Sequence, residues 1–485
     1  MNVLFINPPI RTKLPPYTYP VGICYVASFL REHGHQVKII DINGYRLTKN
    51  EFTKTLERET FDVIGLGGLI TTFNHNKWIS QYIKTHYPDV LIFAGNTVAS
   101  TIPRILLTNT KVDIVVDGEG EETCLDLINT LEQGRPLDRV NGIIYKNIEG
   151  KIVENPRRDP IRDLDSLPFP AWDLIPMEIY LENNTKLTGI RSALISTIRG
   201  CPYNCRFCCK TFIGYKVRSR SPKNVIEELI KLIKDYKIEG FLPGDDLFIY
   251  DKARVMKFCD LLIKENLHYL KWSSSARANL LTKELVEKMK TAGCIRIDFG
   301  FESHSQKVLD YYNKKITVQD QQRAINICKE AGMPFFASYI VGARNEDEDS
   351  LRECDEFCRK NGYQYYPSNL LMPLPGTAIY EECVQRGIIK DELAYIIKLS
   401  KGGDADILIV NCTEKFCDDE LVKIFKKYRT LPIIERIRYH LGFVKRFQQD
   451  VFDYGLKYSL QNSIKTAIAL TRGSQIEIED RNRWS

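Results

Sequence analysis

The stretch "RGCPYNCRFCCK", residues 199–210, places four cysteines close together, at Cys201, Cys205, Cys208 and Cys209. The first three have the spacing C-x3-C-x2-C and follow a strand-like run, "ALISTIR". Three thiolates from one loop suit an iron–sulfur cluster, whereas a structural zinc site needs four protein ligands. A cluster held by three cysteines leaves one iron open for a substrate or cosubstrate. We therefore expect the first three as cluster ligands and Cys209 as a neighbour without that role.

The cysteines open a segment, residues 191–395, in which strand-like and helical runs alternate. The strand-like runs are "ALISTIR", "GFLPGDD", "KWSSSARAN", "IRIDFGFES", "FFASYIVG" and "YQYYPSNLLMPLPGT". Amphipathic stretches such as "SPKNVIEELIKLIKDYK" separate them. Six strand–helix units predict a parallel β/α barrel or partial barrel, with its active residues at the strand ends.

Residues 1–134 show a similar alternation. Runs such as "NVLFIN", "QVKIIDI" and "VLIFAGN" predict strands of a doubly wound, Rossmann-like parallel sheet. Such sheets bind ligands at the carboxyl edge of their strands. The first turn, "NPPIRTKLPPYTYP", contains prolines where a dinucleotide-binding loop has G-x-G-x-x-G, so the ligand is not expected to be NAD.

Two further segments complete the predicted organisation, which gives an α/β fold class with a helical C-terminal part. Residues 135–190 read as a connector, with a hairpin that turns near Gly150 and then a proline-rich stretch. Residues 396–485 read as a basic helical domain, for which a simple solvated helical cap is the favoured interpretation. The alternatives are that it covers the active site, attracts an anionic substrate or touches a membrane surface.

Composition narrows the class of protein. The chain has 485 residues, 44% of them hydrophobic and 27% charged, with a formal net charge of +6, so nucleic acid is not an expected partner. No run approaches 18 apolar residues, and the start "MNVLFINPPI" lacks the basic region of a signal peptide. The 14 cysteines are then better explained by a reducing cytoplasm than by a disulfide scaffold.

The motifs together resemble one enzyme family over nearly the whole chain. "RGCPYNCRFC" resembles the C-x3-C-x-aromatic-C motif of radical S-adenosylmethionine (SAM) enzymes, and "GDDLF", "ARANLL", "MKTAGCIRIDFGFES" and "MPLPGTAIY" continue that pattern. "NPP", "GLGGLITT", "AGN", "DIVVDGEGEET", "GIIYKNIEGKI" and "DLDSLPFPAWDL" resemble the cobalamin-binding subgroup.

The resemblance implies three cofactors: a 4Fe-4S cluster, SAM and cobalamin. In this family the amino and carboxylate groups of SAM bind the open iron, and an electron from the cluster releases a 5′-deoxyadenosyl radical. In the cobalamin subgroup, methylcobalamin often delivers a methyl group to the substrate radical. The resemblance also implies that the enzyme acts under anaerobic conditions and receives its electron from a flavodoxin- or ferredoxin-type donor.

The resemblance also assigns residues. Cys201, Cys205 and Cys208 would hold the cluster. Contacts to SAM would come from Phe207, Asp245, Asp246, Arg277, Glu302, Gly342 and Pro373. Contacts to cobalamin would come from Asn7, Pro8, Gly67, Gly68, Leu69, Thr71, Gly95, Asn96 and Glu119. For Asp246 a turn cap, and for Arg277 a structural ion pair, are the competing interpretations.

The chain departs from one cobalamin pattern, because it lacks D-x-H-x-x-G, the signature of proteins that ligate cobalt through histidine. We therefore expect no histidine on cobalt, and we expect His33 and His35 at the surface.

The leading functional hypothesis is methylation of an unactivated carbon of a small-molecule or lipid substrate. The nearest alternative uses the same cofactors for oxidative cyclisation or rearrangement, such as tetrapyrrole ring formation. A tRNA methylthiotransferase is disfavoured because residues 1–130 hold only Cys24 and Cys124, too few for that class's N-terminal cluster. A non-enzymatic cobalamin or iron–sulfur module would leave the barrel's strand-end residues unexplained.

Overall fold

The computed structural model describes residues 1–11, 14–210, 214, 216–402 and 408–429. The chain divides into two units, Met1–Leu421 and Val422–Ser485, and the fold below is that of the first. The predicted helical domain at residues 396–485 lies mostly outside the described residues. Of that region the structure describes α16 (Glu392–Gly402) and α17 (Asp418–Arg429).

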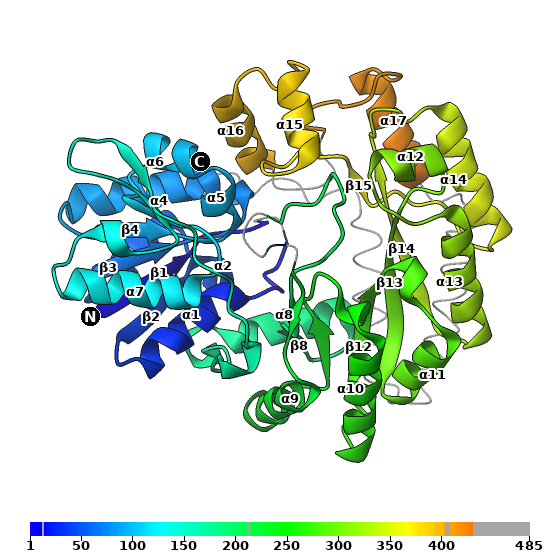
Figure 1. Ribbon diagram of the computed structural model, residues 1–485, viewed down its shortest axis with the longest axis horizontal. Coiled ribbons are helices and arrows are strands. Elements are labelled where there is room, and N and C mark those ends of the chain that lie inside the picture. The colour runs from blue at the N-terminus through cyan, green and yellow to red at the C-terminus, as the bar shows by residue number, and fades with distance from the viewer. Residues whose placement is uncertain (12–13, 211–213, 215, 403–407, 430–485) are drawn as a thin grey trace. The chain divides into compact units, whose positions relative to one another are not determined.

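The N-terminal part is built on a seven-stranded sheet with the order β2-β1-β3-β4-β5-β6-β7 (Figure 1). The first five strands are parallel, as predicted, and β6 and β7 are antiparallel additions. The hairpin predicted near Gly150 thus forms, but its strands extend this sheet. The strands are β1 (Asn2–Asn7), β2 (Gln36–Asp41), β3 (Val63–Leu66), β4 (Leu91–Ala94), β5 (Ile114–Val116), β6 (Ile143–Lys146) and β7 (Ile152–Glu154).

Apolar side chains on both faces of the sheet explain why helices cover it. Leu30 of α1 and Leu127 of α7 join Val3 and Phe5 in one buried cluster, so burial of apolar surface holds these helices on the sheet. The helices of this part are α1 (Val21–Glu32), α2 (Ile42–Tyr45), α3 (Lys49–Leu56), α4 (Phe73–His86), α5 (Asn96–Thr101), α6 (Pro103–Asn109) and α7 (Gly120–Glu132).

The connector after β7 contains short 3₁₀ turns and one helix, α8 (Met177–Thr188). Its Tyr180 is fully buried and donates a hydrogen bond to Asp41 at the end of β2 (2.8 Å). The connector is therefore packed against the sheet by a specific buried contact.

The second part is a curved, all-parallel sheet of six strands with the order β15-β14-β13-β12-β11-β8. β8 and β15 are its two edge strands, and among the described residues they do not pair with each other, so the sheet stays open and the predicted partial barrel is confirmed. The strands are β8 (Ser192–Ile195), β11 (Gly240–Pro243), β12 (Lys271–Ala276), β13 (Cys294–Glu302), β14 (Phe335–Val341) and β15 (Asn369–Leu370).

Helices between these strands cover the outside of the curved sheet (Figure 1). Several begin at side-chain caps; Thr317, for example, caps α13 in a reciprocal pair with Asp320. The helices are α9 (Pro222–Tyr236), α10 (Lys252–Lys264), α11 (Lys283–Thr291), α12 (Gln306–Tyr311), α13 (Val318–Glu330), α14 (Glu348–Lys360) and α15 (Ala378–Gln385).

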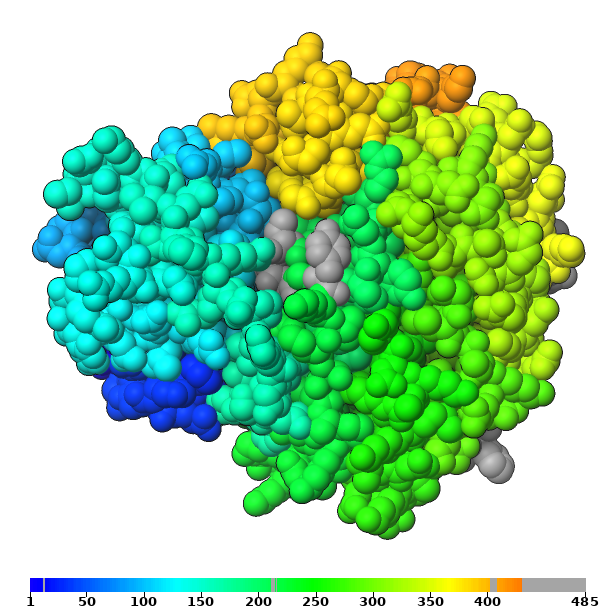
Figure 2. All heavy atoms as spheres, in the orientation of Figure 1, coloured from blue at the N-terminus to red at the C-terminus, as the bar shows by residue number. Residues whose placement is uncertain are grey.

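Helix α16 connects the two parts of this unit. The Ser400 hydroxyl donates to the carbonyl of Thr71 (2.7 Å), and the backbone N–H of Asn74 donates to Ser400 (2.9 Å). In Figure 2 the gold segment accordingly lies beside the blue one. Among the described residues, no helix is long and apolar enough to cross a membrane.

Candidate functional site

The three predicted cluster cysteines line one cavity of about 510 Å³, whose other walls include residues at or after the carboxyl ends of β11 and β12 and residues within β13 and β14. Three predicted SAM contacts, Phe207, Asp246 and Arg277, line it with them. In the described part of the chain, no three His, Cys, Asp or Glu side chains converge on a single metal ion. The three cysteines instead line an open space, which a cluster of several irons would need.

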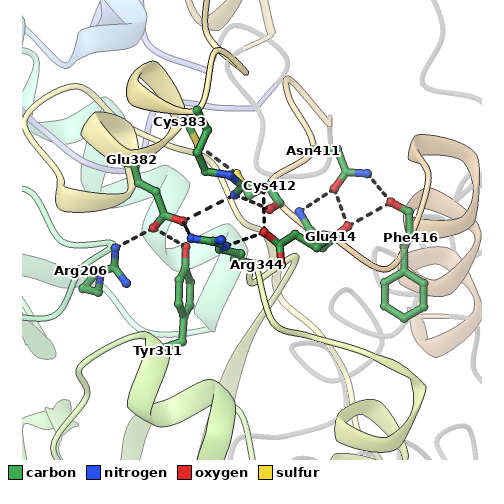
Figure 3. Close-up of polar contacts among 11 residues, drawn as sticks. Arg206, Tyr311, Arg344, Glu382, Cys383, Asn411, Cys412, Glu414 and Phe416 are labelled. Carbon is green, nitrogen blue, oxygen red and sulfur yellow. Dashed lines mark hydrogen bonds and ion pairs between the residues drawn. The ribbon is translucent and has the colours of Figure 1, made fainter.

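The cysteine loop is tied to the outer side of the barrel by backbone and side-chain contacts. The Arg206 N–H donates to the carbonyl of Tyr312 (3.0 Å), and the Ile379 N–H donates to the carbonyl of Arg206 (3.2 Å). The Arg206 guanidinium pairs with Glu382 of α15 (2.6 Å), which also accepts from the Tyr311 hydroxyl (3.1 Å) (Figure 3). These contacts fix the middle of the loop to the barrel.

Asp245 holds the segment that leads into this loop. Its carboxylate accepts from the Thr197 N–H (2.6 Å), the Thr197 hydroxyl (2.5 Å) and the Ile198 N–H (2.9 Å). Burial raises the pKa of Asp245 to about 6, although these hydrogen bonds oppose the rise. Asp245 is absent from the cavity lining, so the structure separates it from its neighbour Asp246.

Arg277 is the clearest candidate for binding an anionic group. Its side chain is 5% exposed, and its guanidinium carbon lies 3.6 Å from the centre of the Tyr203 ring. Nη1 lies 3.9 Å from the Cys205 sulfur, while Nε and Nη2 have no hydrogen-bond partner among the described residues. A buried cation with unused donors beside the cysteines fits a carboxylate ligand and disfavours the structural ion pair.

The other predicted SAM residues, Glu302, Gly342 and Pro373, do not line the cavity of the cysteines. Glu302 pairs with Lys314 (2.7 Å), and it is Lys314 that lines the cavity. The Gly342 N–H donates to Glu346 (2.6 Å), and the Pro373 carbonyl accepts from the Tyr395 hydroxyl (2.6 Å). Neither Gly342 nor Pro373 lines the cavity. The structure therefore does not place them in direct contact with a ligand in this cavity.

A second cavity, of about 300 Å³, lies between the strand ends of the N-terminal sheet and those of β8 and β11. Four predicted cobalamin residues line it: Gly67, Gly95, Asn96 and Glu119. Its wall is largely apolar, with Phe5, Val26, Leu66, Phe93 and Val116. Glycine backbone beside an apolar cavity suits close approach of a large organic ligand.

The remaining predicted cobalamin residues are not part of this lining. Asn7 donates to Asp41 (2.7 Å), and Pro8 is buried beside it in the chain. Gly68 has a φ of +119°, and a Cβ there would approach the Thr72 hydroxyl to 2.6 Å. Leu69 is 43% exposed, and the Thr71 carbonyl accepts from α16.

No histidine is among the described residues that line the second cavity. His33 is exposed, as predicted. The surface prediction for His35 is wrong, because it is 5% exposed and lies 3.1 Å from Asn129 and 3.3 Å from the N-terminal nitrogen. A polar partner on each ring nitrogen explains its burial.

The two cavities meet at Asp246, which lines both of them. Burial raises the pKa of Asp246 above its ordinary value, while the charge of Lys210 and a hydrogen bond from the Gly200 backbone oppose the rise. A ligand in either cavity would therefore face the same carboxylate.

Sequence reasoning missed the ion pairs between the two parts. Arg199 pairs with Glu121 (2.6 Å) and Glu119 (3.4 Å), and Arg218 also pairs with Glu119 (2.7 Å). Burial opposes ionisation of Glu119, but Arg218 and Arg199 outweigh it and lower the pKa of its carboxyl. The sequence feature that could have indicated these ion pairs is the position of Arg199, immediately before Gly200 and Cys201 at the start of the cysteine motif.

Comparison with known proteins gives two matching family models. The model described as the radical SAM superfamily matches residues 195–358, and the one described as the B12 binding domain matches residues 8–128. An uncharacterised methyltransferase of Pyrococcus horikoshii is 30% identical over 395 residues, covering 80% of this chain and 84% of the relative. An anaerobic magnesium-protoporphyrin IX monomethyl ester cyclase of Rubrivivax gelatinosus is 28% identical over 473 residues, covering 93% and 83%.

Solved structures agree in fold. The cobalamin-dependent SAM radical enzyme OxsB, with aqua-cobalamin and SAM bound, gives a TM-score of 0.73 at 20% identity, covering 100% of this chain and 77% of that one. The radical SAM methyltransferase TsrM from Kitasatospora setae, with cobalamin and a [4Fe-4S] cluster bound, gives 0.67 at 18% identity, covering 79% and 75%.

Proposed function

The chain belongs to the radical SAM superfamily and carries a B12-binding domain, and from this we propose that it methylates an unactivated carbon of a small-molecule or lipid substrate. Its cofactors are a 4Fe-4S cluster, SAM and cobalamin. The observation that carries the proposal is the shared position of Asp246, at which the cavity of the cysteines meets the cavity of the B12-binding domain.

When bound, the cofactors supply a 5′-deoxyadenosyl radical and a transferable methyl group, and the chain positions the groups that react. Cys201, Cys205 and Cys208 would hold the cluster. Arg277 would bind the SAM carboxylate through its two unused nitrogens, and Asp246 would accept a hydrogen bond from the SAM amino group. Phe207 would lie against the adenine.

Lys314 and Glu302 would act as a pair in the same cavity. The pairing would hold the lysine ammonium, which lies 5.5 Å from the centre of the Phe207 ring, in the cavity of the cysteines. Gly342 and Pro373 would act indirectly, by shaping the backbone behind β14 and β15.

For cobalamin, we propose that Gly67, Gly95 and Asn96 form the direct contacts at the strand ends. The loop of Gly68, Leu69 and Thr71 would support them, with α16 packed behind it. Asn7 and Pro8 would fix the first strand end. The apolar wall would exclude water from the bound ligand.

We propose the domain division predicted from the sequence, with the hairpin strands β6 and β7 added to the first domain. Residues 1–134 would form the cobalamin domain together with the hairpin strands β6 and β7, which continue its sheet. The rest of residues 135–190 would be the connector, residues 191–395 the radical SAM barrel and residues 396–485 a helical C-terminal domain.

Oxidative cyclisation is the second candidate. It is supported by the similarity to the Rubrivivax gelatinosus cyclase, which extends over 93% of this chain. Both reactions need the same two cavities, so the products distinguish them.

For partners, we propose a flavodoxin- or ferredoxin-type electron donor and no nucleic acid. A reducing, cytoplasmic location is supported by the 14 cysteines, since no disulfide joins them in the described part of the chain.

The test is an anaerobic reconstitution with iron, sulfide and hydroxocobalamin, followed by dithionite, SAM and mass spectrometry of the products. We expect slow formation of 5′-deoxyadenosine that disappears in the triple variant Cys201→Ala/Cys205→Ala/Cys208→Ala. Cobalamin-dependent S-adenosylhomocysteine would support methylation, and 5′-deoxyadenosine alone would support cyclisation. A cluster-loaded protein that neither binds SAM nor forms either product would refute the proposal.

A further inference from the structure

Arg199 stands two positions before the first cluster cysteine, yet its charge partners lie on the B12-binding domain. Its guanidinium donates to Glu121 (2.6 Å) and lies 3.4 Å from Glu119. The side chains are 14% exposed for Arg199, 4% for Glu121 and 8% for Glu119. The cysteine loop therefore begins at a buried ion pair that crosses between the two parts.

The two carboxylates are themselves fixed. Glu119 also accepts from Arg218 (2.7 Å) and from the Ile161 N–H (2.8 Å), and it immediately precedes helix α7. Arg199, Glu119 and Glu121 all line the second cavity. Any occupant of that cavity would adjoin the ion pair directly.

The strength of such a pair depends on what fills the cavity. Water in the cavity screens the charges, whereas an organic ligand that displaces the water lowers the local dielectric and strengthens the pairing. A stronger pairing holds Arg199, and with it the start of the cysteine loop, more firmly.

We propose that Arg199, through Glu121 and Glu119, is a positioning residue that couples cobalamin binding to cluster binding. The inference rests on the proposed function, because it takes cobalamin as the occupant of the second cavity. Coupling between two binding sites is reciprocal, so the loaded cluster must tighten cobalamin binding by the same factor by which cobalamin tightens the cluster.

The measurement is the Kd for hydroxocobalamin, by anaerobic equilibrium dialysis, for the full chain before and after cluster reconstitution. In the wild type we expect reconstitution to lower the Kd at least about fivefold, the lower end of typical coupling between sites. In Arg199→Lys and in Glu121→Gln we expect the ratio to fall below about twofold. The iron content and the EPR signal of the reduced cluster should stay near wild type, which separates lost coupling from a lost site.

The chain offers a matched control in the same loop. Arg206 pairs with Glu382 at the same distance, 2.6 Å, but on the barrel side (Figure 3). Arg206→Lys and Glu382→Gln therefore make the same chemical changes without touching the B12-binding domain, and both should keep the wild-type ratio.

Three results would overturn the inference: a wild-type ratio near one, an unchanged ratio in Arg199→Lys, or an equal loss in the control variants. If circular dichroism shows that Glu121→Gln does not fold, the ratio of Kd values measured for Arg199→Lys alone tests the inference. A wild type that takes up its cluster but never binds cobalamin would refute the proposed function as well. Intact cobalamin binding without coupling would refute this inference alone.

Discussion

Replacement of Arg277 by glutamine tests the SAM site most directly. Its side chain is 5% exposed, and Nε and Nη2 lack hydrogen-bond partners among the described residues. A structural arginine would use such donors within the protein, because unpaired buried donors cost stability. We therefore expect Arg277→Gln to weaken SAM binding while leaving the SAM-free protein at least as stable as wild type.

The size of the effect follows from the loss of one of the two proposed hydrogen bonds, because the glutamine amide can still donate one. Hydrogen bonds to charged groups contribute about 1.5–3 kcal/mol. Because about 1.4 kcal/mol corresponds to a tenfold change in affinity, the Kd for SAM should rise about 10- to 150-fold.

The assay is anaerobic titration of SAM into cluster-loaded protein by calorimetry, with Tm measured without SAM. Arg254 provides the control, since it is also buried but donates to the carbonyls of Arg220 (3.0 Å) and Thr197 (3.1 Å). Arg254→Gln should lower Tm and change the SAM affinity less than Arg277→Gln. An affinity for SAM within about threefold of wild type in Arg277→Gln, with full cluster content, would refute the assignment.

Three other predictions address the cysteines, cobalt and a buried acid. Cys208→Ala should lose the cluster and Cys209→Ala should keep it, as measured by iron and sulfide content and by EPR; equal loss in both would contradict the ligand assignment. In protein labelled with 15N-histidine, the EPR spectrum of the cob(II)alamin form should match that of unlabelled protein, and a nitrogen superhyperfine splitting that changes from a triplet to a doublet on labelling would reveal a histidine on cobalt. Burial raises the pKa of Glu346 from 4.5 to about 7 against the hydrogen bond from Gly342, so the folded state binds more protons than the unfolded state between these pH values. The free energy of unfolding should then fall by up to about 3 kcal/mol as pH rises from about 4.5 to 7. Urea titrations should show that Glu346→Gln removes this fall. The same pH dependence in the wild type and in the variant would contradict the prediction.

The sequence predicted both sheets and the cysteine loop because these features depend on local patterns. Short β-branched runs separated by helices predict parallel strands, and the crossover rule then places the carboxyl ends of these strands at one edge. Asp246 and Arg277 follow directly from this, since each stands just after a barrel strand.

Side-chain partners could not be predicted in the same way, because they depend on residues far apart in the chain. Asp245 and Asp246 are adjacent in sequence, but only Asp246 reaches the cavities, since Thr197 and Ile198 bind Asp245. Glu119 was predicted from its strand-end position, whereas its ion pairs with Arg199 and Arg218 appear only once the two parts pack together.

The antiparallel hairpin of β6 and β7 also affects how separate molecules meet. Without it, β5 would be a bare strand edge, and bare edges promote pairing between chains. The edge strand β7 has only three residues, Ile152–Glu154, and Glu154 forms an ion pair with Arg104 (2.6 Å). A short, charged final strand offers little template for another chain, so this edge should resist aggregation at the high protein concentrations used for anaerobic reconstitution.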